Sequence, residues 1–409
     1  MRPRDPMVAE LAAAEMSMLV GYPIAPSDLG WRGEAYHGDD FGLAVAEKPS
    51  GTLRTIAGLS GRDMRRRDLL YDGAVFVAAA FADPVLASLT GVVETISRDE
   101  IVPPVPTASM IRDMTETFRK LDARYGGAEI RGQVVAFLHD RARAALENRH
   151  TPDLFSSLAE LTQFSGWLAQ DCDRQALAQR YYIQALGLAE HSGDTMLASR
   201  ILSAMSDQAG RLGQYRQSLA MAKAAIDRSH GSASPTVRAM LHDKHAWALG
   251  RMGDEPGCSQ ALIDMEDELE RAKPGDGPQW ASHYDEVDVA ECKGHCFLLL
   301  GKAKAAEPLL LESRSRPPAS RTRTRSYAEA DLALSYLRQH GPDVEAALDA
   351  ASRAIDLAGQ LDSARITDKL REVDRRLSRH DDVVAVRELR ARSAPLIART
   401  ESHTQVAVA

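Results

Sequence analysis

Aromatic residues are scarce in this chain: phenylalanine, tryptophan and tyrosine together make up 5% of its 409 residues. A series of β-sandwich domains depends on aromatic and β-branched strands, so this scarcity disfavours that architecture, and the many Ala, Leu and Arg residues favour helices. The 44% apolar residues are enough for a substantial core, which excludes disorder as the default. We therefore predict an all-α protein with about two to four domains or one elongated array of repeats.

Cysteine, long apolar runs and an excess of positive charge are also lacking. Four cysteines (Cys172, Cys258, Cys292 and Cys296) are too few for a disulfide framework and fit a reducing compartment. No run of about 18 apolar residues exists that spans a bilayer, so we predict a cytoplasmic protein without membrane contact. Because 50 basic residues are outnumbered by 58 acidic ones, the chain is unsuited to coating nucleic acid, and any DNA contact would have to be local.

One segment imitates an export signal. Arg66-Arg67 followed by the short apolar stretch from Gly73 to Ala82 has the order of a twin-arginine signal. A targeting signal lies at the N-terminus, so this interpretation requires translation to begin at Met64. The alternative, which we prefer, is a basic helix start that leads into a buried helix.

Small residues recur along the chain at a spacing typical of helical repeats. After Ala178, a large residue follows four positions later and an Ala-Leu pair three positions beyond it, as in tetratricopeptide repeats. The series continues at Ser218, Cys258, Ala306 and Ala347, with steps of 40, 40, 48 and 41 residues. A small residue allows the two helices of a unit to cross closely. We expect a tetratricopeptide-like α-solenoid of about six or seven antiparallel helix pairs.

The domain organisation is predicted from prolines, glycines and periodicity. Pro103 to Pro106 marks a boundary at about residue 105, and a helix pair follows it, with helices over 108–124 and 129–148 joined at Gly126-Gly127. A charged pair from about 366 to 394 is suited to cap the array. The predicted segments are a helix-turn-helix remnant over 1–30, a linker and helical segment over 31–105, a repeat domain over 106–395 and a flexible tail over 396–409. Within the second segment, the Gly-rich stretch 32–50 is simplest to interpret as a linker.

Four segments carry a resemblance to a known family: Phe118 to Gly127, Phe164 to Asp171, Leu177 to Leu186, and Met205 to Gly213. They are similar to actinobacterial transcriptional regulators that join an N-terminal helix-turn-helix of the Xre type to a C-terminal tetratricopeptide array. The resemblance covers roughly residues 60–400. It implies a regulatory protein that binds a peptide, a small molecule or a protein partner and forms a homo-oligomer.

The N-terminal end departs from this family. In such regulators the recognition helix lies upstream of an Arg-Pro-Arg-x-Pro stretch, a final helix, and a closing Pro-hydrophobic-x-x-x-Asp-Leu-Gly segment. Here the first of these stretches is Arg2 to Pro6, and the closing segment ends at Gly30, so residues 1–30 are interpreted as a remnant. Either the true start of the protein lies upstream or the recognition helix of the DNA-binding domain has been lost. We expect DNA contact only through an upstream domain, and no residue is nominated as a base reader.

A ligand groove is placed by counting back from the small residues. The first helices of successive tetratricopeptide units expose one concave groove, where a peptide or small ligand contacts several repeats. Amide, carboxylate and guanidinium groups there suit a peptide backbone, and the two tryptophans either anchor a ligand or fill the core between helices. The predicted groove residues are Gln163, Trp167, Gln170, Ser203, Asp207, Arg211, Asp243, Trp247, Arg251, Glu291 and His295.

Two histidine-containing clusters suggest weaker sites. Cys292, His295 and Cys296, with His283 nearby, invite a zinc interpretation, but zinc sites use two close ligand pairs and no second pair exists at a useful spacing. Inward packing of both cysteines is preferred, and no metal is expected. His242 and His245 share a helix face without a neighbouring carboxylate or cysteine pattern, so we interpret them as surface or groove residues.

A run of arginines and the absence of catalytic motifs complete the pattern. Contact of the arginines with phosphate is one interpretation, and a solvated linker between repeats is the preferred one. These residues are Arg314, Arg316, Arg321, Arg323 and Arg325.

No phosphate loop, Ser-His-Asp order, Gly-x-Ser-x-Gly elbow or His-Glu-x-x-His motif is found, so neither enzymatic activity nor a cofactor is expected. The predicted function is the sensory and oligomerising part of a transcriptional regulator, and the alternative is a freestanding scaffold for a protein partner.

Overall fold

The structure, a computed structural model, describes residues 41–64, 76–90, 94–96, 106–147, 150–315, 321–361 and 363–405. Within these ranges it contains sixteen α-helices and no strand, which confirms the all-α prediction. No helix of this described part is both long and apolar enough to cross a bilayer. The predicted helix-turn-helix remnant, residues 1–30, and the twin arginines lie outside the described residues.

The chain forms two compact units that differ from the predicted domain boundaries. Unit 1 comprises residues 1–116, 131–170 and 174–201, and unit 2 comprises 117–130, 171–173 and 202–409. Residue 105, where the boundary was predicted, falls inside the first range of unit 1.

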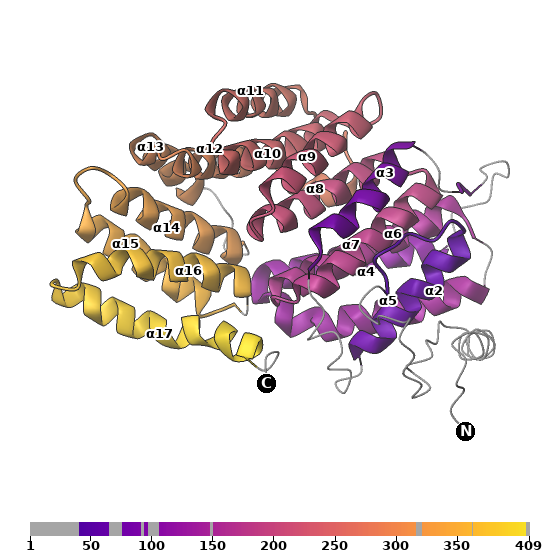
Figure 1. The fold of residues 1–409 in the computed structure, drawn as a ribbon, viewed down its shortest axis with the longest axis horizontal. Helices are drawn as coiled ribbons and strands as arrows, with labels where there is room; N and C mark the ends of the chain where they lie inside the picture. Colours follow the sequence, from indigo (N-terminus) through magenta and orange to yellow (C-terminus); the bar gives the residue numbers. More distant parts are fainter. Residues whose placement is uncertain are drawn as a thin grey trace. The chain divides into compact units, whose positions relative to one another are not determined.

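Most helices of unit 1 come from the first half of the chain (Figure 1). They are α2 (Pro49–Met64), η4 (Ala78–Phe81), α3 (Ala82–Thr90), α4 (Pro106–Tyr125), α5 (Gly127–Glu147), α6 (Pro152–Asp171) and α7 (Gln175–Ser192), with the shared helices α4, α5 and α6 each passing into unit 2 at one end. Helices α4 and α5 are the pair predicted over 108–124 and 129–148. Gly126 joins them at φ +92°, a conformation that glycine adopts without steric cost.

Residues 41–50, part of the predicted linker, are held against α7. Gln184 on α7 donates hydrogen bonds to the carbonyls of Gly42 and Ala44 at 3.0 and 2.8 Å, and Arg180 Nε donates to Phe41 O at 3.0 Å. The following helix α2 buries Leu53, Ile56 and Leu59 completely and packs on α7. The free linker predicted over 32–50 is therefore wrong for its described part, because α7 carries polar groups that pair with this backbone.

The α7 helix is also contacted by the next stretch of chain. Gln179 exchanges two hydrogen bonds with the backbone of Val77, and the Nδ1 of His191 lies 2.6 Å from Glu94 O. The other ring nitrogen of His191 is 3.0 Å from the hydroxyl of Thr52. Almost every residue of α7 is buried, and several of its polar side chains form hydrogen bonds with segments up to 142 residues earlier in the chain.

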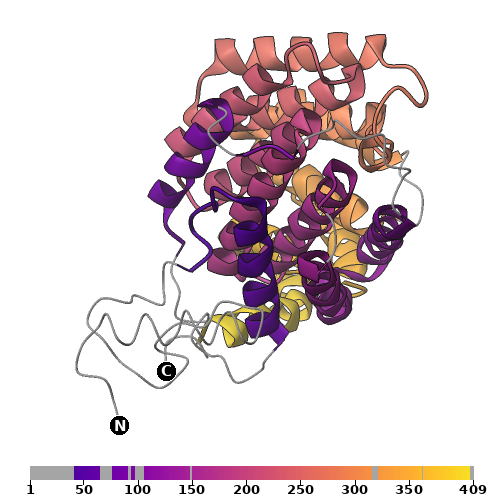
Figure 2. The same cartoon turned by 90° about the vertical axis from the view of Figure 1, so that its right-hand side faces the viewer.

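Unit 2 consists of successive antiparallel helices (Figures 1 and 2). They are α8 (Thr195–Arg211, whose first turns belong to unit 1), α9 (Tyr215–Ser229), α10 (Pro235–Met252), α11 (Glu255–Arg271), η5 (Gln279–Ala281), α12 (Glu286–Leu299), α13 (Ala303–Ser315), α14 (Thr322–Leu337), α15 (Val344–Ala358), α16 (Ala364–Leu377), η6 (Ser378–His380) and α17 (Val384–Gln405). Helices α10, α12, α14 and α16 pack on one another in that order, and α10, α12 and α14 each pack on the helix that follows. The even-numbered helices thus form a continuous row within unit 2.

The small residues of the sequence pattern lie where paired helices approach closely. The Ser206 hydroxyl donates to Ser218 O at 2.7 Å, and Cys258 Sγ lies 3.4 Å from Ala246 O, in each case across twelve residues. A side chain on Gly294 would lie 3.6 Å from the carbonyl of Ala306, again twelve residues on. The predicted small residues Ala178, Ser218, Cys258, Ala306 and Ala347 are all buried. Ser218, Cys258 and Ala306 therefore each face a second small residue, a pairing that the sequence analysis did not anticipate.

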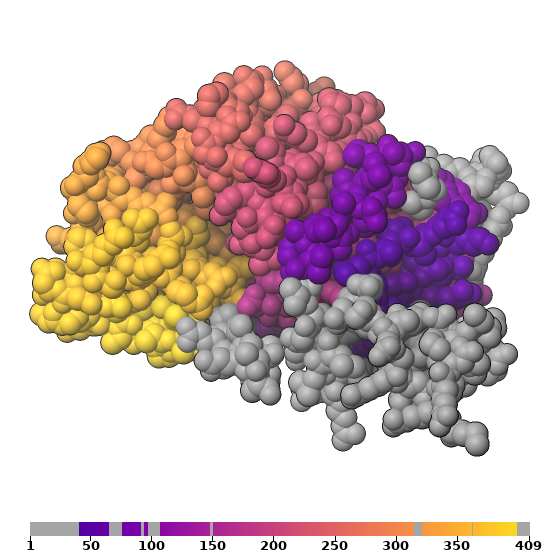
Figure 3. All heavy atoms as spheres, viewed as in Figure 1, coloured from indigo at the N-terminus to yellow at the C-terminus, as the bar shows by residue number. Residues whose placement is uncertain are grey.

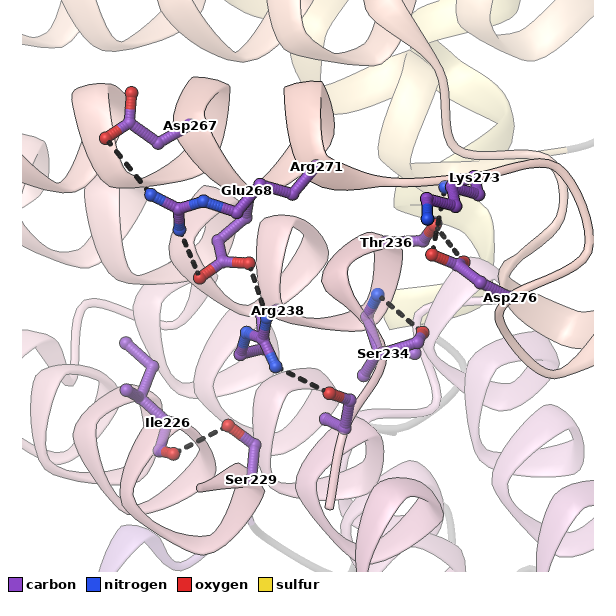
Figure 4. Close-up of polar contacts among 12 residues, drawn as sticks. Ile226, Ser229, Ser234, Thr236, Arg238, Asp267, Glu268, Arg271, Lys273 and Asp276 are labelled. Carbon is purple, nitrogen blue, oxygen red and sulfur yellow. Dashed lines mark hydrogen bonds and ion pairs between the residues drawn. The ribbon is translucent and has the colours of Figure 1, made fainter. Parts of the chain in front are cut away.

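Polar contacts fix the ends of the α10 and α11 pair (Figure 4). Arg238 on α10 donates to the carbonyl of Ala233 at 2.7 Å and to Glu268 on α11 at 2.7 Å. Arg271 contacts the same carboxylate from the next turn at 3.2 Å, and Ser234 caps the N-terminus of α10. These contacts set the crossing of the two helices at the end remote from Cys258.

The C-terminal pair extends further than predicted. Helix α17 runs to Gln405 and pairs with α16, yellow in Figure 3, so the expected capping pair is present. The flexible tail predicted over 396–409 is wrong for residues 396–405, which are helical. Leu396 and Ile397 pack against the apolar core of α14 to α17, and this packing gives the helix a reason to continue.

Candidate functional site

Eight of the eleven predicted groove residues lie in unit 2, on the even-numbered helices α8, α10 and α12. Seven of them join one group of charged and aromatic side chains, to which α14 and α16 contribute further residues. We call this group the charged cluster: Asp207, Arg211, Asp243, Lys244, Trp247, Arg251, Glu291, His295, Tyr327, Asp331, Arg365 and Lys369.

The indole of Trp247 lies at the centre of the charged cluster. The imidazole of His295 lies against it with ring centroids 4.4 Å apart and an angle of 36° between the rings. Lys244 Nζ is 4.0 Å from the indole centroid, and the guanidinium carbons of Arg251 and Arg211 are 5.3 and 6.0 Å from it. Cations are attracted to the electron-rich face of an indole, so the ring gathers three positive charges around itself.

Asp207 links helix α8 to helix α16, the last helix of the row. Its carboxylate accepts a hydrogen bond from Arg211 Nε on α8 at 2.9 Å and lies 3.5 Å from Arg365 Nη2 on α16. Burial raises the pKa of Asp207, but Arg211 and Arg365 outweigh burial and hold that pKa well below its usual range. Asp207 therefore stays ionised and serves as the counter-charge of two arginines.

A second set of contacts runs from α12 to α16. His295 Nδ1 lies 3.0 Å from one oxygen of Asp331, and Lys369 Nζ donates to the other oxygen at 2.6 Å. Burial and the nearby Lys369 lower the pKa of His295 to about 4, although Asp331 opposes this shift. At neutral pH the imidazole is therefore uncharged, and Asp331 is balanced by Lys369.

The middle of the charged cluster holds two more acidic side chains. Asp243 accepts a hydrogen bond from Lys244 at 2.9 Å and from the hydroxyl of Tyr284 at 3.2 Å. Burial, together with Asp288 and Asp331, raises the pKa of Glu291 to about 8. Glu291 is consequently protonated for the most part at neutral pH and contributes little negative charge.

Positive charge is in excess in the charged cluster. At neutral pH its five cations face three ionised carboxylates, because His295 is uncharged and Glu291 is mostly protonated. Four of the cations contact a carboxylate. Arg251 forms no hydrogen bond or ion pair with any residue in the described part of the chain, and its one aromatic contact is Trp247. One excess positive charge is therefore that of Arg251, and the other arises because Arg211 and Arg365 share the single carboxylate of Asp207.

The other predicted groove residues have different surroundings. Gln163, Trp167 and Gln170 lie on α6 within unit 1, where the Gln170 side chain accepts a hydrogen bond from Tyr182 of α7 at 2.8 Å. Gln170 thus contacts the partner helix of its own pair. Ser203 is 1% exposed, and its hydroxyl is buried without a hydrogen-bond partner.

Five cluster residues were absent from the predicted set: Lys244, Tyr327, Asp331, Arg365 and Lys369. In the last repeat the cluster residues Tyr327 and Asp331 stand 20 and 16 positions before the small residue Ala347. In the middle repeats they stand 7, 11 and 15 positions before it. Extending the count unchanged to Ala347 would have given Leu332 and so missed Asp331 by one residue.

The cysteine and histidine clusters are structural in this fold. Cys292 and Cys296 are 1% and 0% exposed, which confirms inward packing. No group of three or more His, Cys, Asp or Glu residues suited to a metal ion occurs among the described residues. His242 is half-buried, and its Nδ1 lies 3.8 Å from the exposed carboxylate of Asp264 on α11. Burial lowers the pKa of its neighbour His245 to about 4.

The arginine run does not form the solvated linker that was preferred. Arg321 pairs with Asp285 and Asp288 at 3.4 Å each, and Arg323 lies on α14 and pairs with buried carboxylates. Arg314 lies 3.9 Å from Glu329, and Arg316 lies outside the described residues. The described arginines with these contacts act as internal counter-charges, because α14 begins earlier than the sequence indicated and carries them against acidic residues.

Comparison of the chain with protein-family models gave no match, and comparison with curated proteins gave none either.

Proposed function

We propose that this chain is a tetratricopeptide-like binding protein, whose charged cluster binds a ligand within unit 2. The observation that carries the proposal is the convergence of side chains from α8, α10, α12, α14 and α16 around Trp247 and Arg251. Binding proteins built from repeats use such rows of helices because each repeat adds side chains to one continuous surface. The closely packed small residues support the tetratricopeptide interpretation.

Within that function, we propose the role of the sensory and oligomerising part of a transcriptional regulator. The sequence resemblance to regulators of the Xre and tetratricopeptide type supports this role. A ligand that bridges Arg251 and Arg211 would also change the balance of charges on Asp207 and Arg365, and so would couple α8 to α16. Such a coupling is the kind of change that a sensor transmits.

Mass spectrometry of the purified chain tests the binding function. We expect a small molecule or peptide to copurify with the wild-type chain and to be lost from Arg251→Ala. A matched variant, Arg216→Ala, removes an exposed arginine of α9 and should retain the ligand. Recovery of the same ligand from both variants in equal amounts would contradict the assignment of the site.

The regulatory role has a rival, a freestanding scaffold that docks a protein partner. Reading the codons upstream of Met1 separates the two, because an in-frame helix-turn-helix favours the regulator and a stop codon directly before Met1 favours the scaffold. Light scattering with and without the copurified ligand measures whether the chain is a homo-oligomer and whether binding changes that state.

A further inference from the structure

We propose that the charged cluster binds an oxyanion, a carboxylate or phosphate group of a small ligand, through the guanidinium of Arg251. This inference rests on the proposed binding function and specifies the chemistry of its ligand. Three features of unit 2 carry it: the fixed position of the guanidinium, its lack of a counter-ion and the surrounding excess of positive charge.

The Arg251 guanidinium is held in a defined place. A Cβ on Gly210 of α8 would lie 2.8 Å from Arg251 Nη1, so glycine at this position leaves the room that the guanidinium occupies. On its other side the group lies over the indole of Trp247, with 5.3 Å between the guanidinium carbon and the ring centroid. A guanidinium oriented in this way presents its remaining N–H groups at a fixed angle.

The same guanidinium forms no ion pair with any carboxylate in the described part of the chain, and Asp207 attracts it only from a greater distance. Arg211 has Asp207, Lys244 has Asp243 and Lys369 has Asp331, at 2.9, 2.9 and 2.6 Å. Arg251 is half-buried, and burial lowers its pKa. A charged group in such surroundings is normally paired, and a carboxylate or phosphate matches the planar donor pattern of arginine best.

The charge of the ligand follows from the charges of the cluster. Two positive charges remain uncompensated at neutral pH, and Arg211 and Lys244 lie around the same indole as Arg251. An anion of one or two negative charges would neutralise this excess. An oxygen of a neutral ligand can accept hydrogen bonds from Arg251 but leaves the positive charge uncompensated, so it binds more weakly than an oxyanion.

Isothermal titration of the full chain with succinate and with inorganic phosphate tests the proposal, with chloride at matched ionic strength as the reference. We expect succinate or phosphate to bind measurably above the chloride reference, and the anion that binds better identifies the group as carboxylate or phosphate. Arg251→Gln should weaken that binding about tenfold or more, and Arg251→Lys should retain part of it. Gly210→Ala should also weaken it, because the added methyl group displaces the guanidinium.

Arg216→Gln, which removes an exposed arginine from α9, should bind within about twofold of wild type, since an exposed surface charge is screened by salt. Circular dichroism establishes that each variant is folded. Absence of binding by both anions, or full affinity in a folded Arg251→Gln variant, would overturn the proposal. An uncharged molecule that copurifies in an Arg251-dependent manner would overturn the oxyanion but leave the binding function intact. If the chain binds an oxyanion but no ligand copurifies with it, the result supports the oxyanion proposal and counts only against the proposed ligand-binding function.

Discussion

Arg323 forms a two-pronged contact with Asp122, a residue 201 positions earlier in the chain: Nη1 donates to one carboxylate oxygen at 2.8 Å and Nη2 to the other at 2.7 Å. Nη2 also lies 3.2 Å from the carboxylate of Asp171, which in turn accepts hydrogen bonds from Ser363 and from the Gly127 amide. One arginine of α14 thus fixes the ends of α4 and α6 within unit 2.

Replacing Arg323 by Met should therefore be strongly destabilising. The variant leaves Asp122 and Asp171 buried without their cation, and loss of one partner from a buried ion pair costs about 3–5 kcal/mol. Urea unfolding measures the change. Arg325→Met, two residues further along α14, is the control and should change the free energy of unfolding by less than about 1 kcal/mol. Equal stability of the two variants would show that Arg323 is not a structural counter-charge.

The small residues of the repeats should tolerate no enlargement. Ala178 and Ala347 are completely buried, so Ala178→Leu and Ala347→Leu should each lower the free energy of unfolding by about 1–3 kcal/mol through overpacking. Ala220→Leu, at an exposed position of α9, provides the comparison. Unchanged melting temperatures of both buried variants would mean that the repeat register is wrong.

Stability should fall as the pH rises from 6.5 to 8.5. The folded pKa of Glu291, about 8, lies above its usual value of 4.5, so the folded chain holds a proton that the unfolded chain releases. The resulting stabilisation is complete below about pH 4.5 and is lost as the pH rises through 8. Asp288, with a pKa raised by burial to about 7, acts in the same direction.

Glu291→Gln should flatten this pH dependence by up to about 1.4 kcal/mol per pH unit, since it removes one titrating group. Denaturant unfolding at several pH values measures the slope. The range above 6.5 is chosen because His295, with its pKa lowered to about 4, destabilises the fold only as the pH falls below 6.5. A slope identical to that of wild type would place the carboxyl of Glu291 in water.

The N-terminal segment should detach locally when its partners on α7 are removed. Gln184→Leu deletes the donor to Gly42 O and Ala44 O and should leave these carbonyls without partners. We expect faster hydrogen exchange in peptides covering residues 41–60, with little change in α10 to α17. Gln217→Leu, at an exposed position of α9, serves as the control. Uniformly faster exchange across the chain would indicate global destabilisation instead.

Local patterns in the sequence determined the helices and the positions where they cross. Apolar periodicity and Gly126 predicted α4 and α5, and the spacing of Ala178, Ser218 and Cys258 predicted buried crossings. These features depend on residues within one helix pair, where backbone geometry relates spacing to direction. The same counting selected Trp247 and Arg251, which lie together on α10 of unit 2.

Only the tertiary structure decided which charged groups face one another. Asp207 contacts Arg365, 158 residues later in the chain, and Arg323 contacts Asp122, 201 residues earlier, because packed helices bring distant parts of the chain together. The sequence contains these charges but does not indicate which residues pair. The residues next to an arginine in the sequence do not show whether its side chain will be buried or exposed. Residues 41–50 were likewise interpreted as a linker, since their order comes from the polar side chains of α7 rather than from any propensity of their own.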